Sequence, residues 1–371
     1  MSAYLIKNVG DKKWLWFKKT NNYLLLEKDV FRVFEQLHNG NSPEDVIDWC
    51  MNNYHLSRRQ AQETVSQINA LFSAQLNKPT EKTKASILRS APDSFYSTKV
   101  YKFQSSLFHL FYGNAALETM FHPLFAHLEI DKADIEAVQI RLFFEKNQYG
   151  LQINKETIRV WTKSEDHLLK GQVFMALLNA AYAKKENDWM GVLHASAIGN
   201  EQNSVLFLGD SGNGKSTAAA IALASGLSLI ADDFVPIDTS GRVLTFPAAI
   251  SVKKHALAFL SQRFPELLKA KEYELKAMNK TVRYLAPKVR SNSASRQVKS
   301  LVFIKYDSAI DFEFSPMDKH IAFQHLVVDS WLSPQEENAR FFLDWMADLP
   351  CYLLSYSNNE KMIEKIKELL V

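Results

Sequence analysis

The chain has 371 residues, which is long for one domain and suggests two or three. Hydrophobic residues make up 47%, enough for sizeable cores, while the net charge of +3 is too small to indicate a nucleic-acid or membrane surface on its own. The two cysteines, Cys50 and Cys351, lie far apart without metal-ligand spacing, which argues against a disulfide framework and a zinc site. We find no signal-peptide core and no apolar run long enough to span a membrane, so we expect a cytoplasmic protein with no membrane partner.

The first 73 residues are predicted to form a small winged-helix-like domain that opens on a β-ribbon. Two aromatic, strand-like segments at 13–17 and 23–26 are separated by a turn-prone pair of asparagines. Three short helices are expected to follow and to bury apolar stripes against the ribbon.

Each of these helices has a recognisable start. Asp29 is expected to cap the first helix, Ser42 with Pro43 the second, and Ser57 with Gln60 the third. The apolar stripe predicted for the third helix is Ala61, Val65, Ile68, Leu71 and Phe72.

The segment 74–94 is polar, contains two prolines and lacks aromatic residues. It is predicted to be a linker to a second domain at 95–371. This second domain is expected to begin with antiparallel strands and then a helix with Leu168 in its core. The predicted strands are 138–144, 151–153 and 157–161, and the predicted helix is 167–184.

The sequence GDSGNGKST matches the phosphate-binding loop pattern G-x-x-x-x-G-K-[ST]. An apolar strand-like run precedes it and an alanine-rich helix-forming run follows it, as a phosphate loop at a helix N-terminus requires. A chance match is expected in roughly one sequence of this length per hundred at about 7% glycine usage. The predicted nucleotide-binding residues are Gly209, Asp210, Ser211, Gly212, Asn213, Gly214, Lys215, Ser216 and Thr217.

Residue chemistry assigns this loop to a nucleoside triphosphate with Mg²⁺. Glycines at 209, 212 and 214 allow backbone N–H groups to approach the phosphates. Lys215 is predicted to neutralise the β- and γ-phosphates, and the Ser216 hydroxyl to ligate Mg²⁺.

Two adjacent carboxylates, Asp232 and Asp233, follow a short apolar strand 17 residues after Lys215. Acids at that position can hold Mg²⁺ or accept the proton of an attacking hydroxyl. The plainer interpretation is a solvated turn, which the neighbouring phosphate loop makes less attractive.

His194, the phosphate loop and the Ala-Asp-Asp motif together resemble the kinase domain of HPr kinase/phosphorylase and its relatives over residues 194–236. The resemblance implies an α/β fold (α+β overall) with the phosphate loop of phosphoenolpyruvate carboxykinases, and ATP-dependent phosphorylation of a serine hydroxyl. It implies that Asp232 is the base, that Asp233 helps to hold the metal, and that His194 lies beside the transferring phosphate. Such relatives often form rings, which leaves homo-oligomerisation open.

One departure limits what the resemblance implies. Thr217 stands where the bifunctional HPr enzymes have glutamate, and their C-terminal phosphorylase motif is not recognisable. We therefore expect kinase chemistry without the reverse reaction.

The N-terminal ribbon and helices resemble PqqD-like peptide-recognition domains. Those domains bind the leader of a ribosomally made precursor peptide as an added strand. A tethered leader-binding domain would raise the local concentration of the acceptor residue. The combined prediction is a kinase that modifies such a peptide.

Two basic features have weaker interpretations. Arg58 and Arg59 begin the third helix, where winged helices read DNA, but that helix lacks a basic face and nucleic acid is an unlikely partner. The Arg- and Ser-rich segment 280–296 either contacts the phosphates or the acceptor, with Arg283 and Arg290 as candidates, or is a surface loop.

Three other functions stay open. The acceptor could be a small molecule such as free serine, or a carrier protein of the HPr type. A different class is a regulator that binds nucleotide without catalysis.

Overall fold

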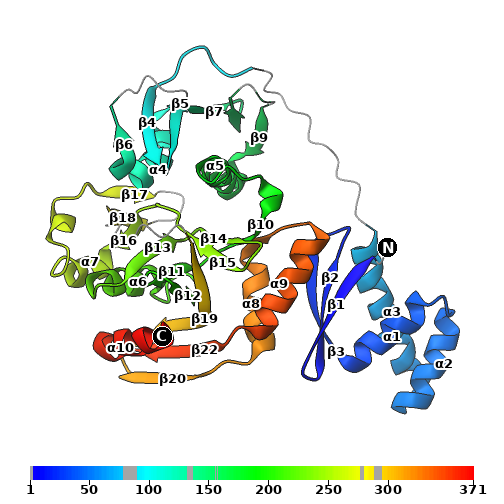
Figure 1. Ribbon diagram of the computed structural model, residues 1–371. Helices are drawn as coiled ribbons and strands as arrows, with labels where there is room; N and C mark the ends of the chain where they lie inside the picture. The colour runs from blue at the N-terminus through cyan, green and yellow to red at the C-terminus, as the bar shows by residue number, and fades with distance from the viewer. Residues whose placement is uncertain are drawn as a thin grey trace. The chain divides into compact units, whose positions relative to one another are not determined.

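The computed structural model describes residues 3–77, 90–131, 137–154, 156, 158–275, 280–287 and 295–371. The chain has a mixed α/β structure (Figure 1) and divides into two compact units. In the described residues, unit 1 comprises 3–77 and Asp318–Leu349, and unit 2 comprises 90–317 and Pro350–Val371. The segment Asp318–Leu349 therefore groups with the N-terminal part of the chain, whereas the sequence places it in the second domain. Within the predicted linker, residues 78–89 lie outside the described residues.

Unit 1 opens with a three-stranded antiparallel sheet in the order β1-β2-β3. The strands are β1 (Tyr4–Val9), β2 (Lys12–Phe17) and β3 (Asn22–Glu27). The two strands predicted from the sequence are confirmed, and β1 is an additional strand. The central strand β2 buries four consecutive side chains, Trp14 to Phe17, so both faces of the ribbon are covered.

The three predicted helices are present, and two of their three predicted starts are confirmed. They are α1 (Lys28–His38), α2 (Pro43–Tyr54) and α3 (Arg58–Leu76). Ser42 and Ser57 each form a capping box, which satisfies backbone N–H groups at the helix start. The predicted cap at Asp29 is wrong, because α1 begins earlier, after Glu27, and Asp29 lies in its first turn. Leu71 is also wrongly placed in the core and is 40% exposed.

The second face of the ribbon is covered by a segment from late in the chain. This segment forms α8 (Lys319–Val328), β21 (Ser330–Leu332) and α9 (Glu336–Asp348). Trp14 stacks on Phe323 with ring centroids 4.1 Å apart, and its indole N–H donates to His320 Nδ1 at 3.0 Å. The ribbon is thus packed between helices that are close to it in sequence and helices about three hundred residues away.

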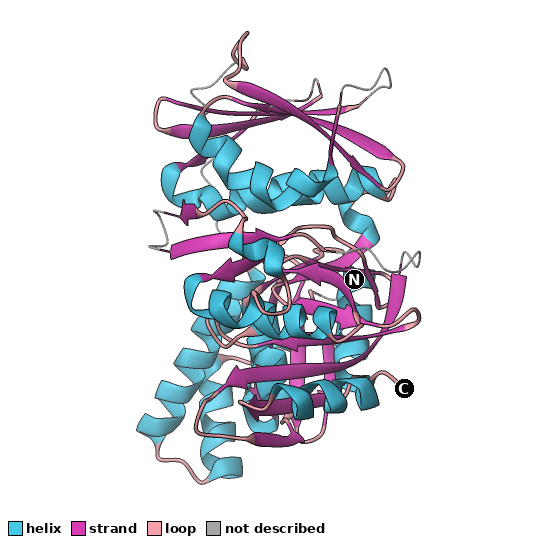
Figure 2. Cartoon of the chain, turned by 90° about the vertical axis from the view of Figure 1, so that its left-hand side faces the viewer, coloured by secondary structure: helices cyan, strands magenta, loops and turns pink. Residues whose placement is uncertain are grey.

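Unit 2 begins with a six-stranded sheet in the order β6-β4-β5-β7-β8-β9. Two helices lie along one face of this sheet (Figure 2). The elements are β4 (Ser97–Phe103), β5 (Ser106–Tyr112), α4 (Ala115–Phe125), β6 (Glu129–Ile130), β7 (Val138–Glu145), β8 (Gln148–Ile153), β9 (Arg159–Thr162) and α5 (Asp166–Ala181). The predicted antiparallel strands and helix are present, although residue 157 lies outside the described part. Leu168 is 45% exposed, and its neighbour Leu169 takes the core position instead.

The second sheet of unit 2 carries the predicted phosphate loop, residues 209–217. Its strands run in the order β13-β11-β12-β19-β15-β14-β10, and β22 and β20 continue from β19. The elements are β10 (Trp189–Leu193), β11 (Ser196–Gly199), β12 (Asn203–Leu208), α6 (Lys215–Ala224), β13 (Ser228–Asp232), β14 (Val235–Asp238), β15 (Arg242–Leu244), β19 (Ser295–Tyr306), β20 (Phe312–Pro316), β22 (Cys351–Tyr356) and α10 (Asn359–Leu369). β12, β19 and β22 are parallel, and their carboxyl ends meet at the loop edge of the sheet.

A third, smaller sheet completes unit 2. It consists of β16 (Ile250–Lys253), β18 (Lys280–Leu285) and β17 (Tyr273–Leu275), with α7 (Lys254–Leu260) beside it. Its apolar residues share one buried core with α6 and with the closing strand and helix, β22 and α10. That core holds the helix of the phosphate loop in place from several sides.

Candidate functional site

The phosphate loop leaves β12 at Leu208 and enters α6 at Lys215, so the predicted order of strand, loop and helix is present. Gly209, Gly212 and Gly214 have φ of 126°, 106° and 96°, in the left-handed region that favours glycine. A Cβ at Gly209 would also lie 2.9 Å from the backbone oxygen of Ile304. The motif glycines are therefore needed for the backbone conformation and not only for ligand access.

Lys215 is folded back onto this loop and is 8% exposed. Its ammonium donates to the backbone oxygens of Gly209 at 2.5 Å and Asp210 at 3.4 Å. Because Lys215 is the first residue of α6, its charge adds to the positive end of the helix dipole. The loop is thus electrostatically suited to hold an anion.

Asp232 lies at the end of β13, opposite Ser196 on β11. Its Oδ1 accepts hydrogen bonds from the Ser196 hydroxyl at 2.5 Å and from the Ser216 hydroxyl at 3.2 Å. The side chain is buried, and this burial raises the pKa of the Asp232 carboxyl to about 6, against the lowering effect of the two hydroxyls. One predicted acid therefore contacts the serine of the phosphate loop directly.

Asp233 has a different environment, because its backbone turns into the left-handed region with φ of 67°. Its N–H donates to the Ala195 backbone oxygen at 2.9 Å. Its Oδ1 lies 3.0 Å from His194 Nδ1, and its Oδ2 lies 3.0 Å from Lys170 Nζ. The two adjacent acids thus point to different partners, with Asp233 bridging a histidine and a lysine.

These contacts shift the pKa of both partners in the Asp233–His194 pair. Burial would raise the pKa of the Asp233 carboxyl, but the positive charges of Lys170 and His194 outweigh it and hold this pKa well below its usual range. The hydrogen bond to Asp233 raises the pKa of His194 above its usual value, against the opposing effect of burial.

Arg283 is not part of this cluster. Arg283 lies on β18, where its guanidinium donates to the backbone oxygens of Leu267 at 2.7 Å and Leu268 at 2.8 Å and faces Glu272 at 3.6 Å. Arg290 lies outside the described residues. The structure therefore brings together the loop, Asp232, Asp233 and His194, while Arg283 has structural partners elsewhere.

Two residues of the site, Ser196 and Lys170, were not predicted from the sequence. Ser196 could have been found, because it lies two residues after His194 at the start of a strand, next to the predicted histidine. Lys170 gives no such signal, because it comes from α5, more than sixty residues before the acid it contacts. A contact of that kind requires the tertiary structure.

The arginines proposed as an alternative DNA-reading pair are engaged with acids in unit 1. Arg58 contacts Glu44 at 2.6 Å and Asp48 at 3.4 Å, and Arg59 contacts Glu63 at 3.0 Å. Their charges are locally balanced, which disfavours phosphate-backbone binding.

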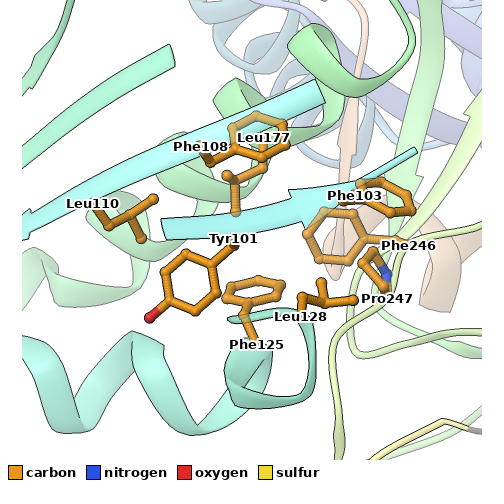
Figure 3. A pocket seen from close by; sticks show the side chains of 9 residues that line it. All are labelled: Tyr101, Phe103, Phe108, Leu110, Phe125, Leu128, Leu177, Phe246 and Pro247. Carbon is orange, nitrogen blue, oxygen red and sulfur yellow. The ribbon is translucent and has the colours of Figure 1, made fainter. Parts of the chain in front are cut away.

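A small apolar pocket lies in unit 2 (Figure 3), and no residue of the loop at 209–217 lines it. Its volume of about 10 Å³ is too small for more than a single water molecule. The hydroxyl of Tyr101 points away from it and contacts the Tyr112 hydroxyl at 3.0 Å and His122 Nδ1 at 2.9 Å. The lining residues are Tyr101, Phe103, Phe108, Leu110, Phe125, Leu128, Leu177, Phe246 and Pro247. We regard this pocket as a packing gap in the core.

Magnesium in nucleotide sites needs few protein ligands, because phosphate oxygens and water supply the others. A group of three or more His, Cys, Asp or Glu side chains suited to a metal does not occur among the described residues. The Ser216 hydroxyl with the Asp232 carboxylate nevertheless fits the oxygen donor set of Mg²⁺. No described helix is both long enough and apolar enough to cross a bilayer.

No family model matches the chain, and no curated protein matches it. A solved structure, TbiB1 in complex with the TbiA(beta) leader peptide, matches 20% of this chain and 90% of its own chain at 22% identity, with a TM-score of 0.19. A TM-score this low does not define a shared fold.

Proposed function

We propose that this chain is a kinase that transfers the γ-phosphate of ATP to a serine-type hydroxyl of a peptide, with a ribosomally made precursor peptide as the substrate class. The observation that carries the proposal is the contact of Asp232 with Ser216, which brings the paired acids to the phosphate loop. A nucleotide-binding loop without acids at its edge could bind ATP, but it would lack groups for metal and proton handling.

The loop and the first turn of α6 would bind the triphosphate. Backbone N–H groups around the three left-handed glycines face the phosphates, and the Lys215 ammonium exchanges its backbone oxygens for phosphate oxygens. The free-energy cost of this exchange is small, because the Lys215 ammonium gives up hydrogen bonds to neutral backbone oxygens and gains hydrogen bonds to charged phosphate oxygens.

Ser216 and Asp232 would hold the magnesium ion. When bound, the ion would neutralise charge on the phosphate oxygens during transfer. This assignment differs from the one implied by family resemblance, in which Asp232 is the base. Asp232 is 4% exposed and already accepts from two hydroxyls, so an acceptor hydroxyl has little room to reach it.

His194 is better placed to take the acceptor proton. Its Nδ1 donates to Asp233, which leaves Nε2 as the proton-accepting atom, and its side chain is 39% exposed. In the transfer step, the acceptor oxygen forms a bond to the γ-phosphorus, the bond between that phosphorus and the β,γ-bridging oxygen breaks, and ADP leaves. The hydroxyl proton passes to His194 Nε2, and Asp233 stabilises the resulting imidazolium.

Unit 1 would supply the peptide specificity. Its three-stranded ribbon has two edge strands, β1 and β3, and an edge strand can accept an extended peptide as an added strand. Tethering the leader there would raise the effective concentration of the acceptor residue at the transfer site.

Mass spectrometry after incubation with MgATP tests this proposal. We expect a short precursor peptide to gain one phosphate on a serine-type residue with the parental protein, and none with the Lys215→Ala variant. Free serine and a small carrier protein, each incubated in parallel, test the other acceptors. If one of them is phosphorylated and the peptide is not, the peptide substrate is wrong; unchanged ATP with every acceptor would favour a regulator.

A further inference from the structure

We propose that Lys170 is a positioning residue of the phosphoryl-transfer site, which acts through Asp233 to hold His194 toward the acceptor. This inference rests on the proposed function. It assigns a role to a residue of α5, outside the stretch that carries the sequence motifs.

The contact geometry gives each oxygen of the Asp233 carboxylate one basic partner. Lys170 Nζ is 3.0 Å from Oδ2 and His194 Nδ1 is 3.0 Å from Oδ1. With both oxygens engaged, the carboxylate cannot rotate about its Cβ–Cγ bond without breaking one contact. Lys170 therefore fixes the orientation of the group that in turn fixes the imidazole.

The backbone at Asp233 makes such support necessary. A non-glycine residue in the left-handed region is strained, and it persists only where its surroundings determine it. α5 provides two such restraints: Lys170 contacts the Asp233 side chain, and Phe174, one turn later, packs edge-on against Phe234 with ring centroids 5.3 Å apart. The helix thus holds residues 233 and 234 together.

A purely stabilising role explains this arrangement poorly. The Lys170 and Asp233 side chains are 33% and 49% exposed, and ion pairs with that exposure contribute little to stability. The cation that the sequence assigned to the distal side of the site, Arg283, is bound to backbone oxygens and Glu272 instead. Lys170, on α5, contacts one of the two adjacent acids, Asp233.

Kinetics of the full chain with three variants test the proposal. Lys170→Met removes the charge, and Lys170→Arg retains it. Lys184→Met is the matched control, because the Lys184 ammonium lies 4.7 Å from the Trp189 ring centroid, as Lys170 lies 5.2 Å from that of Phe174. We expect Lys170→Met to lower kcat by about 10- to 100-fold with KM for ATP within about twofold, Lys170→Arg to recover most of that loss, and Lys184→Met to match the parent.

A binding experiment tests the same claim without an acceptor. Titration calorimetry with ADP alone, and with ADP plus aluminium fluoride as a mimic of the transferring phosphoryl group, should show about tenfold weaker binding of the mimic to Lys170→Met at unchanged ADP affinity. Equal binding of both ligands by Lys170→Met and the parent would overturn the proposal. So would a parallel loss of ADP affinity and thermal stability in Lys170→Met and Lys184→Met.

Failure of the proposed function has a different signature. If the parental protein binds the ADP–fluoride mimic through Lys170 but phosphorylates no peptide, the peptide substrate is wrong and the role of Lys170 is supported. If the parental protein binds no nucleotide, both proposals are wrong.

Discussion

The phosphate loop of unit 2 and the β-ribbon of unit 1 are assembled in opposite ways. The loop is determined by a short stretch of sequence, in which glycines set the backbone and Lys215, Ser216 and Asp232 follow within one strand–loop–helix–strand passage. The ribbon is completed by α8 and α9, whose residues come some three hundred positions later. Local backbone geometry can be predicted from the sequence, whereas a core shared by distant segments cannot.

The largest effect on ligand binding is expected at the locally determined region. Lys215→Ala should weaken ATP binding by at least about 100-fold, because the main cation facing the β- and γ-phosphates is lost. Titration calorimetry measures this, with Lys361→Ala as the control, since Lys361 is paired with Asp311 on the surface. ATP binding by Lys215→Ala at parental affinity would show that the loop is not a nucleotide site.

The distant packing of unit 1 should give the largest effect on the free energy of unfolding. Trp14→Ala and Phe323→Ala should each lower the free energy of unfolding by about 3–5 kcal/mol, because each removes one ring of a buried stack. Denaturant unfolding measures both, and the double variant should lose less than the sum because the two rings contact each other. Leu71→Ala is the control, since Leu71 is 40% exposed. Additive losses would show that the stack is not an energetic unit.

The two adjacent acids should respond to pH in opposite directions. Burial raises the pKa of Asp232 to about 6 from 3.8, so the folded state binds this proton more tightly and stability falls as pH rises from about 4 to 6. Asp232→Asn should therefore raise the free energy of unfolding of the nucleotide-free protein at pH 7 to 8, by roughly 1–3 kcal/mol. The gain should vanish below about pH 4.

Asp233→Asn is the counterpart. Because the folded state lowers the pKa of Asp233, the ionised carboxylate stabilises the folded protein at pH values above the ordinary carboxyl pKa of 3.8. This stabilisation is lost progressively as the pH falls from 3.8 toward the lowered pKa. The variant should be less stable than the parent at neutral pH and should approach it in acid. Thermal unfolding from pH 3 to 8 measures both variants, and a shift of the same sign in both would contradict the separation of the two acids.

The smallest effect is expected at Arg58. Its ion pairs with Glu44 and Asp48 are exposed, and such pairs contribute about 0–1 kcal/mol. Arg58→Ala should leave the unfolding transition nearly unchanged and should not alter any retention on a DNA column. A clear loss of DNA retention would revive the nucleic-acid interpretation.

Much of the local structure follows from the sequence, because its causes lie within a few residues. The capping boxes at Ser42 and Ser57 and the left-handed glycines of the loop are examples. The error at Asp29 has a local cause too: a residue inside the first turn can resemble a cap when the helix begins earlier.

The remaining features depend on tertiary contacts. Nothing near Lys170 indicates that it meets Asp233, and the inward turn of Leu169 in place of Leu168 depends on how α5 packs against its sheet. The opposite environments of Asp232 and Asp233 are also hidden in the sequence, where the two residues are identical in type and adjacent. Their environments differ because β13 ends at Asp232 and the backbone of Asp233 turns into the left-handed region.

The insertion of α8, β21 and α9 between β20 and β22 has a consequence for how the polypeptide comes apart. A single proteolytic nick after Asn77 would produce two fragments on a denaturing gel. The shorter fragment would still pack against α8 and α9. These two helices stay covalently joined to unit 2 through Met317 and Pro350. The nicked protein would therefore migrate as a single species under native conditions, and a cut at this point would not release the ribbon.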